Sequence, residues 1–522
     1  MSPENEGPAG PRPERRGGRA ARSARAVHDA AQKPFRQPRR RFAPAMLVSD
    51  DELEAIHEAS LTILEEIGMD FLDAQARQVL RAAGAQVAEG SERVRFDRAM
   101  IKEKIATTPA EFTLFARNPA HNLRFGGDHI IFAQVASTPN CSDADRGRRP
   151  GSQEDFRNLL RLAQHFNIIH MTGGYPVEPV DIHASVRHLD CLSDVVKLTD
   201  KAFHAYSLGR QRNQDALEIV RIGRGISEAQ LEREPSLISV INSSSPLRLD
   251  APMLQGIMEM SARGQVIIMT PFTLAGAMAP VTIAGALAQQ NAEALAGIAF
   301  TQIIRPGAPV VYGGFTSNVD MKSGAPAFGT PEYMKAQLVG GQLARRYGLP
   351  YRTSNTCAAN TVDAQAAYES VFSLWGATMG GGNFILHAAG WMEGGLTASF
   401  EKTILDVDLL QMVAEFLDPL AVDPGALALD AVREVGPGGH YFGAQHTQER
   451  YKTAFYAPLL SDWRNFQSWA EAGSPTAMQK ATKLWKEALA QYQQPALDEA
   501  TGEELDAFVA RRKAEGGVKT DF

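Results

Sequence analysis

The chain has 522 residues, of which 44% are hydrophobic and 22% are charged, so it has ample material for a core and general disorder is excluded. The net charge is −7, but residues 1–44 carry ten Arg and one Lys against four acids, a net of +7 that leaves −14 on the remainder. A nucleic-acid function could rest only on this basic tail, which lacks the apolar core of a secretory signal. We expect residues 1–44 to be a solvated, disordered tail and expect no nucleic-acid partner.

The first predicted element is an amphipathic helix that ends at Gly68. In DDELEAIHEASLTILEEIGMDF (50–71), apolar residues recur at helical spacing up to that glycine. Short apolar runs then alternate with charged stretches. We interpret residues 45–128 as an N-terminal cap of helical and mixed structure.

Eight short runs rich in β-branched and apolar residues follow, at intervals of 29 to 43 residues, each with a longer helical stretch after it. Continuous apolar strands that alternate with helices are typical of parallel strands buried on both faces, and eight such units favour a closed barrel. We therefore predict an α/β fold, a (β/α)8 TIM-type barrel over residues 129–417, with residues 418–522 as a C-terminal extension packing on it. The runs are 130–137, 167–174, 201–208, 236–243, 265–272, 308–315, 351–357 and 383–390.

Two features bear on the cellular compartment. The uncharged run 264–292 is long enough to cross a membrane, but Pro271 and Pro280 interrupt it, so we expect a buried strand, a loop and a helix instead. The three cysteines lie far apart and form no disulfide or zinc spacing. A cytoplasmic protein without membrane attachment is the expected result.

Polar and aromatic residues collect where the predicted strands end, which is where barrel enzymes hold their active sites. Several aromatic rings around one site can enclose a quaternary or tertiary ammonium, although packing explains any single ring equally well. We predict His387 and Glu393 as catalytic residues, with Glu393 as the counter-charge. The predicted substrate-binding residues are Tyr175, His204, Tyr206, Phe272, Tyr312, Phe315, Asn355 and Trp391.

Other chemistries stay open at this point. His204 and His387 lie inside strand runs, where a lone histidine is often a core residue. No HxxxH or HxH spacing occurs, so we expect no tightly bound metal. A barrel lyase or a metal-dependent hydrolase that uses His204, His387 and Glu393 is an alternative, because barrels gather ligands from different strands.

Long strings of this sequence resemble the trimethylamine methyltransferase superfamily, in the same order over about residues 45–465. They are SSSPLRLD (243–250), TPFTLAGAMAPVTIAGALAQQNAEALAG (270–297), VYGGFTSNVDMKSGAPAFGTPE (311–332), DAQAAYES (363–370), HAAGWMEGGLTASFEKTILD (387–406) and HYFGAQHTQERY (440–451). The resemblance implies a barrel that binds a methylated amine, and a cognate corrinoid protein that docks at the barrel mouth. The Co(I) corrinoid (cobalamin) of that separate partner would attack the N-methyl carbon in line. We also expect a homo-oligomer.

One departure from the family bears on the substrate. The founding trimethylamine enzymes carry pyrrolysine near the seventh strand, whereas residues 354–365 (SNTCAANTVDAQ) are all ordinary. Members without pyrrolysine are similar to glycine betaine methyltransferases, so we favour a quaternary, betaine-like substrate. Its carboxylate needs an anion site, for which Arg352, Asn355, His387 and backbone amides are candidates. The alternatives are a trimethylamine methyltransferase proper and a noncatalytic betaine sensor.

Overall fold

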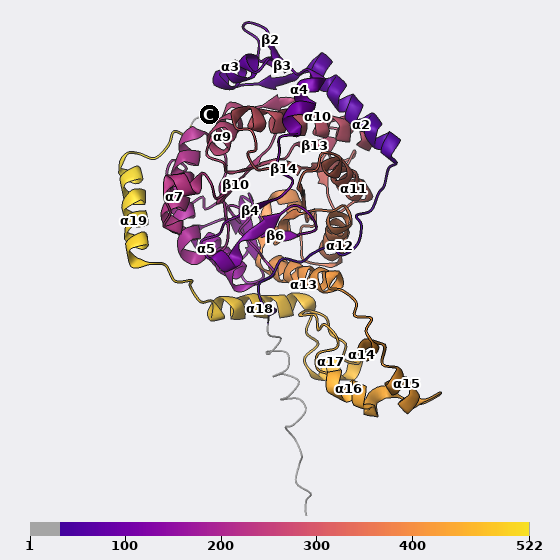
Figure 1. Cartoon of the computed structure of the whole chain (residues 1–522). Coiled ribbons are helices and arrows are strands. Elements are labelled where there is room, and N and C mark those ends of the chain that lie inside the picture. Colours follow the sequence, from indigo (N-terminus) through magenta and orange to yellow (C-terminus); the bar gives the residue numbers. More distant parts are fainter. Residues whose placement is uncertain (1–31, 521–522) are drawn as a thin grey trace, which may run out of the picture.

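The centre of the molecule is a parallel sheet of seven strands, surrounded by helices (Figure 1). A computed structural model of the chain describes residues 32–520. The strands lie in the order β6, β18, β17, β14, β12, β10 and β9, and every neighbouring pair is parallel. Their bounds are β6 Ile131–Gln134, β9 Phe203–His204, β10 Leu237–Ile241, β12 Val266–Met269, β14 Val310–Gly313, β17 Tyr351–Ser354 and β18 Phe384–Ala389. Seven of the eight predicted runs are thus parallel strands.

The remaining predicted run, 167–174, contributes one residue to the sheet instead of a strand. Met171 forms isolated parallel bridges with Ala133 on one side and Ala202 on the other. Two residues later the backbone passes very close to β6: a Cβ on Gly173 would lie 2.1 Å from the Gln134 carbonyl oxygen, so only glycine fits there. The two edges of the seven-stranded sheet therefore approach each other through Met171.

Helices that follow the strands along the chain cover the outer face of the sheet (Figure 1). They are α5 Gln153–His165, α6 Arg187–Leu198, α7 Arg210–Arg224, α9 Ala251–Ala262, α10 Ile283–Ile304, α11 Pro331–Arg346, α12 Ala364–Met379 and α13 Phe400–Leu417. The uncharged run 264–292 becomes β12, a short strand and the start of α10, as predicted. Among residues 32–520, no helix combines the length and the apolar character that crossing a bilayer requires.

Most central strands contribute side chains to two apolar layers, because successive side chains point to opposite faces of a sheet. On β12, Val266 and Ile268 join an inner cluster, while Ile267 and Met269 join the larger cluster beneath the helices. Burial on both faces explains why the runs are almost continuously apolar. The hairpin of β4 (Phe112–Leu114) and β5 (Leu123–Phe125) closes the amino end of the inner cluster, where Phe125 packs against Phe384.

Short strands continue beyond the carboxyl ends of the central strands. β13 pairs in parallel with β15, and β19 and β20 form a small sheet with β7 and β8. These extensions carry three of the aromatic residues predicted to bind substrate, Phe272, Phe315 and Trp391. Their bounds are β7 Asn140–Asp143, β8 Gly147–Pro150, β11 Arg248–Leu249, β13 Phe272–Ala275, β15 Phe315–Val319, β16 Pro326–Ala327, β19 Trp391–Met392 and β20 Thr397–Ser399.

The N-terminal cap begins with α2 (Asp50–Thr62). Ser49 and Glu52 form a reciprocal capping box at its start, and the helix continues as a π-helical turn (Ile63–Ile67). It ends at Gly68, as predicted, because the φ of 78° there favours glycine. The other cap elements are β1 Met69–Phe71, α3 Ala74–Ala82, β2 Gln86–Val87, β3 Arg93–Arg95 and α4 Arg98–Ile105.

Residues 32–44 differ from the predicted disordered tail, whose first 31 residues lie outside the described part of the chain. Arg39 pairs with Asp128 at 3.0 Å, and the Arg40 amide donates to the Asp128 carbonyl oxygen. Arg36 and Arg39 are thus matched by acidic partners on the body, Asp418 and Asp128, which the local sequence does not reveal.

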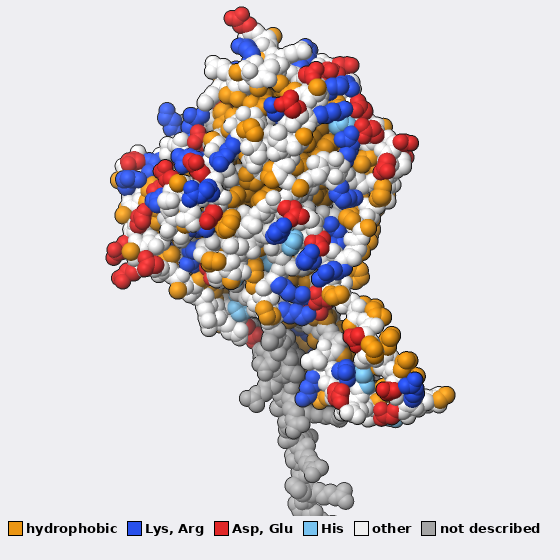
Figure 2. Space-filling model, viewed as in Figure 1, with side chains coloured by type: hydrophobic (Ala, Val, Ile, Leu, Met, Phe, Trp, Pro, Cys, Tyr) orange, Lys and Arg blue, Asp and Glu red, His pale blue; other side chains and the backbone are white. Residues whose placement is uncertain are grey.

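The C-terminal extension divides into two parts. α18 (Ala477–Gln491) packs against α13 and α5, and α19 (Glu499–Ala514) packs against α6 and α7. Residues 418–476, which we call the arm, project away from the body instead (Figures 1 and 2). The arm contains α14 Pro424–Leu427, α15 Leu429–Val435, α16 Gln445–Arg450 and α17 Phe466–Glu471.

Candidate functional site

Three predicted residues meet in one aromatic cluster beyond the strand ends. The His387 and Trp391 rings stack at 5.2 Å with 21° between their planes, and Phe315 lies edge-on, 5.9 Å from His387 and 6.3 Å from Trp391. Phe272, on β13, adds a half-buried ring 5.2 Å from Phe315. The parallel pairing of β13 with β15 places the two phenylalanines side by side. Phe315 therefore joins the other three rings into one cluster.

His387 adopts an unusual backbone conformation. It lies where the register between β18 and β6 shifts, and its φ is 57°, in the left-handed region that non-glycine residues rarely occupy. Such conformations cost on the order of 1–3 kcal/mol and concentrate at functional sites. The irregularity directs the imidazole toward Trp391 and lets Nδ1 share a 3.2 Å hydrogen bond with Ser354 Oγ.

A buried arginine lies against this cluster. The Arg352 guanidinium stacks on Phe315, with Cζ 5.1 Å from the ring centroid, and only 2% of the residue is exposed. Nη1 donates weakly, at 3.4 Å, to the Gly314 carbonyl oxygen, while Nε is buried without a protein acceptor. Among residues 32–520 no carboxylate pairs with Arg352, and burial lowers its pKa to about 10. A buried cation without a counter-ion is costly, so the Arg352 guanidinium is available to pair with an anion from outside the chain.

Both histidines near Arg352 are uncharged at neutral pH. Burial lowers the pKa of His204 to about 4 and that of His387 well below its usual 6.5. The positive charge of Arg352 lowers both further, and His204 also affects His387, so the three side chains share one region. The site therefore holds one cation and two neutral imidazoles.

Tyr175 and Tyr206 form a second aromatic group beside His204. Their rings lie 4.7 Å apart, and Tyr206 is 5.5 Å from His204. The Tyr206 hydroxyl is fixed by Ser137 Oγ at 2.8 Å and by the backbone of Tyr175. The two tyrosines also line a separate cavity of about 200 Å³, together with Glu178, Arg187, His188 and Arg212.

Tyr312, Asn355 and Glu393 lie outside the aromatic cluster. Tyr312 faces the helices, where its hydroxyl donates to Asn291 on α10 at 3.0 Å. Asn355 donates to the Ala388 carbonyl oxygen, behind the site. The Glu393 carboxylate accepts from Arg148 at 2.9 Å, so its charge is already compensated. Packing has separated these three from the ring cluster.

Buried carboxylates that sequence reasoning missed hold the loops in place. Glu293 on α10 accepts from the Leu247 amide at 2.8 Å, Glu369 on α12 from the Ala358 amide at 2.7 Å, and Asp406 on α13 from the Gly390 amide at 2.8 Å. Each therefore fixes the segment that follows a central strand. An isolated acid in an apolar helix, as in QQNAEALAG, is the signal that could have found Glu293.

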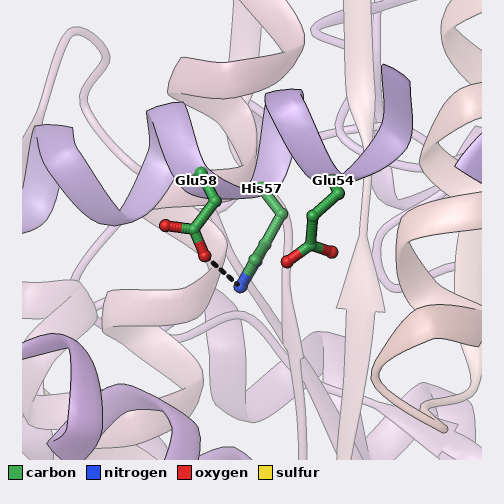
Figure 3. A group of neighbouring side chains, drawn as sticks. All are labelled: Glu54, His57 and Glu58. Carbon is green, nitrogen blue, oxygen red and sulfur yellow. Dashed lines mark ion pairs between the residues drawn. The ribbon is translucent and has the colours of Figure 1, made fainter. Parts of the chain in front are cut away.

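The one close group of potential metal ligands among the described residues lies far from this cluster in the sequence. Glu54, His57 and Glu58 project from α2 with ligand atoms within 4.8 Å of one another (Figure 3). Arg346 pairs with Glu54 at 2.6 Å, and Arg98 pairs with Glu58 at 2.9 Å. Because arginines already neutralise both carboxylates, we interpret the group as an ion-pair network that holds α2 to its neighbours.

The sequence profile described as trimethylamine methyltransferase (MTTB) matches residues 15–517. The chain belongs to this family. It is 39% identical over 472 residues to the glycine betaine methyltransferase of Desulfitobacterium hafniense (strain Y51), a match that covers 90% of this chain and 98% of the relative. It is 26% identical over 474 residues to the trimethylamine methyltransferase of D. hafniense (strain DSM 10664 / DCB-2), covering 90% and 94%. The chain is thus a methyltransferase homologue over almost its whole length.

The fold is similar to that of a solved structure. The crystal structure of the Methanosarcina barkeri monomethylamine methyltransferase matches with a TM-score of 0.52, over 87% of this chain and 90% of that one. The sequence identity is 10%, so this match supports the α/β architecture alone.

Proposed function

We propose that this protein transfers a methyl group from a quaternary, betaine-like amine to the Co(I) corrinoid of a separate partner protein. Arg352 is the observation that carries the proposal, because it is a buried cation without a carboxylate partner among the described residues and it lies beside an aromatic cluster. A betaine supplies both complements, a carboxylate for the guanidinium and an ammonium for the rings. The 39% identity to a glycine betaine methyltransferase supports the same substrate class.

The two neutral histidines favour a quaternary amine over trimethylamine. A tertiary amine is a poor leaving group until it becomes cationic, whereas a quaternary ammonium already carries the charge and leaves as a neutral amine. His204 and His387 have pKa values too low to protonate an amine at neutral pH. Their role is then to shape the site and donate neutral hydrogen bonds.

Positioning is the main contribution that we assign to this chain. The corrinoid of the partner protein, as Co(I), would supply the electron pair for displacement at the N-methyl carbon, and the demethylated amine would leave with the electrons of the broken C–N bond. Arg352 would hold the carboxylate end, while Phe272, Phe315 and Trp391 would hold the ammonium end and exclude water. The buried carboxylates Glu293, Glu369 and Asp406 keep the strand-end segments in register for this task.

The proposal also includes closure of the central sheet into a barrel and a cytoplasmic location. The bridges of Met171 to both sheet edges support closure into an eight-membered barrel over residues 129–417, between the cap and the C-terminal extension. Cys141, Cys191 and Cys357 are free and buried, which fits a reducing cytoplasm.

The test is methylation of Co(I) cobalamin by the purified protein, followed by the visible spectrum of the corrinoid. The substrates are glycine betaine, other betaines, carnitine and trimethylamine. We expect methylcobalamin with a carboxylated quaternary amine and not with trimethylamine. Methylation from trimethylamine alone would reject the substrate class, and calorimetric binding of a betaine without methyl transfer, even with a cognate corrinoid protein, would indicate a sensor.

A further inference from the structure

The arm, residues 418–476, carries an unusual concentration of exposed apolar side chains. Of the 23 large hydrophobic residues that are exposed in the described part of the chain, eleven fall between residues 420 and 466. Leu420 and Phe455 are each 89% exposed, Phe442 is 82% exposed, and Trp463 and Phe466 exceed 70%. Figure 2 shows these hydrophobic surfaces along the projecting arm. Contiguous patches of this kind mark interaction surfaces on soluble proteins.

The arm is anchored to the body at its root. The Leu459 and Leu460 amides donate to Asp408 on α13 at 2.8 and 3.1 Å, and the Tyr456 hydroxyl donates to Gln411 at 2.9 Å. Beyond this anchor, α14 to α17 extend away from the barrel (Figure 1). The fixed root holds the arm in position, while its apolar residues stay uncovered by the chain's own body.

A second apolar surface lies on the body next to that root. Tyr368 and Phe372 are four residues apart on α12, and Met412 and Phe416 are four residues apart on α13, so each pair forms a stripe along its helix. All four are between 41% and 59% exposed, and α12 and α13 pack against each other. We call these four residues the α12–α13 face.

We propose that the arm of one copy covers the α12–α13 face of a second copy, in a mutual two-fold contact. Each chain supplies both an apolar arm and an apolar face, so a symmetric pair buries both surfaces twice without any other partner. A fully buried aromatic side chain covers roughly 150–250 Å², so the eleven arm residues expose on the order of 1,000 Å². That area matches the approximately 800 Å² per partner of a stable interface.

The oligomeric mass of the full chain tests this contact. Light scattering after size exclusion should give at least twice the 56.7 kDa chain mass at about 10 µM protein. The arm variant Phe455→Ser/Trp463→Ser and the face variant Phe372→Glu/Met412→Glu should each give monomers with unchanged circular dichroism. Val281→Ser, at a 67% exposed residue away from both surfaces, is the matched control and should keep the wild-type mass.

Photo-crosslinking identifies which surfaces meet. A benzoylphenylalanine at position 455 in unlabelled protein, mixed with ¹⁵N-labelled protein, should crosslink to labelled peptides from residues 364–417. A monomeric wild-type chain would overturn the proposal and leave the arm to a different protein. Crosslinks confined to the same chain or to other segments, or oligomers that survive both variants, would also overturn it.

Discussion

Replacement of Arg352 by methionine should make the unliganded protein more stable and the betaine complex weaker. The residue is only 2% exposed, and its pKa falls from 12.5 to about 10, which corresponds to an unfavourable free energy of about 3 kcal/mol for the charged form. Because the folded-state pKa is the lower one, this penalty is fully present at neutral pH and disappears only as the pH rises above about 10. Lost stacking on Phe315 offsets about 1 kcal/mol, so we expect a net gain of roughly 1–2 kcal/mol in the free energy of unfolding.

Substrate binding should respond in the opposite direction. Loss of a buried, charge-assisted contact to a carboxylate costs about 2–4 kcal/mol, or roughly 30- to 1,000-fold in Kd for glycine betaine. Choline, which has the same ammonium but no carboxylate, should bind the variant and the wild type equally. Arg352→Lys is the matched control, because it keeps the charge but not the planar fork.

Denaturant unfolding and titration calorimetry, both at pH 7.5, measure the two effects. A variant that is destabilised by more than 1 kcal/mol, with unchanged affinity for glycine betaine, would refute the reasoning. Arg352 would then be a structural residue.

Three further predictions concern other parts of the site. Glu393→Gln should leave the thermal midpoint unchanged within about 1 °C, because Glu393 forms one partly exposed ion pair with Arg148. Calorimetry should show unchanged affinity for glycine betaine, because the Glu393 carboxylate is already paired with Arg148 outside the ring cluster. Weaker binding to this variant would instead place Glu393 in the substrate site. Burial lowers the pKa of His204 from 6.5 to about 4 in the folded protein. The neutral imidazole therefore favours the folded state above pH 6.5. This contribution, up to about 3 kcal/mol, is lost as the pH falls from 6.5 toward 4. His204→Asn should therefore show a smaller drop in unfolding free energy between pH 7 and pH 5 than the wild type, and equal drops would contradict this. Asp406→Asn leaves Lys402 buried without its charged partner and should cost about 3–5 kcal/mol in urea unfolding, whereas a loss below 1 kcal/mol would show that the pair is dispensable.

Local pattern was sufficient to predict the α/β class and the parallel strands of the central sheet. The β-branched runs predicted seven strands at the observed places, and the period of the first helix predicted its end at Gly68. Both signals are short-range, since they depend on side-chain alternation and on the backbone freedom of glycine. The strings around residues 243–297 and 387–406 indicated the family, which the profile match confirmed.

The tertiary structure decided which way each side chain of a strand points and which groups it contacts. Phe315 lies in the aromatic cluster and Tyr312 faces α10, although both belong to the same predicted run. A shift of one residue along a strand exchanges the inner and outer faces, and the exact strand ends that set this facing are not encoded locally.

Long-range pairing is the other property that sequence left open. Arg148 compensates Glu393 from 245 residues away, whereas Arg352 finds no carboxylate among the described residues. By itself the sequence determined which chemical groups the strand ends carry. Only the folded chain decided which of these groups are already paired and which remain to bind a substrate, because the energy of a buried charge depends on neighbours that are distant in sequence.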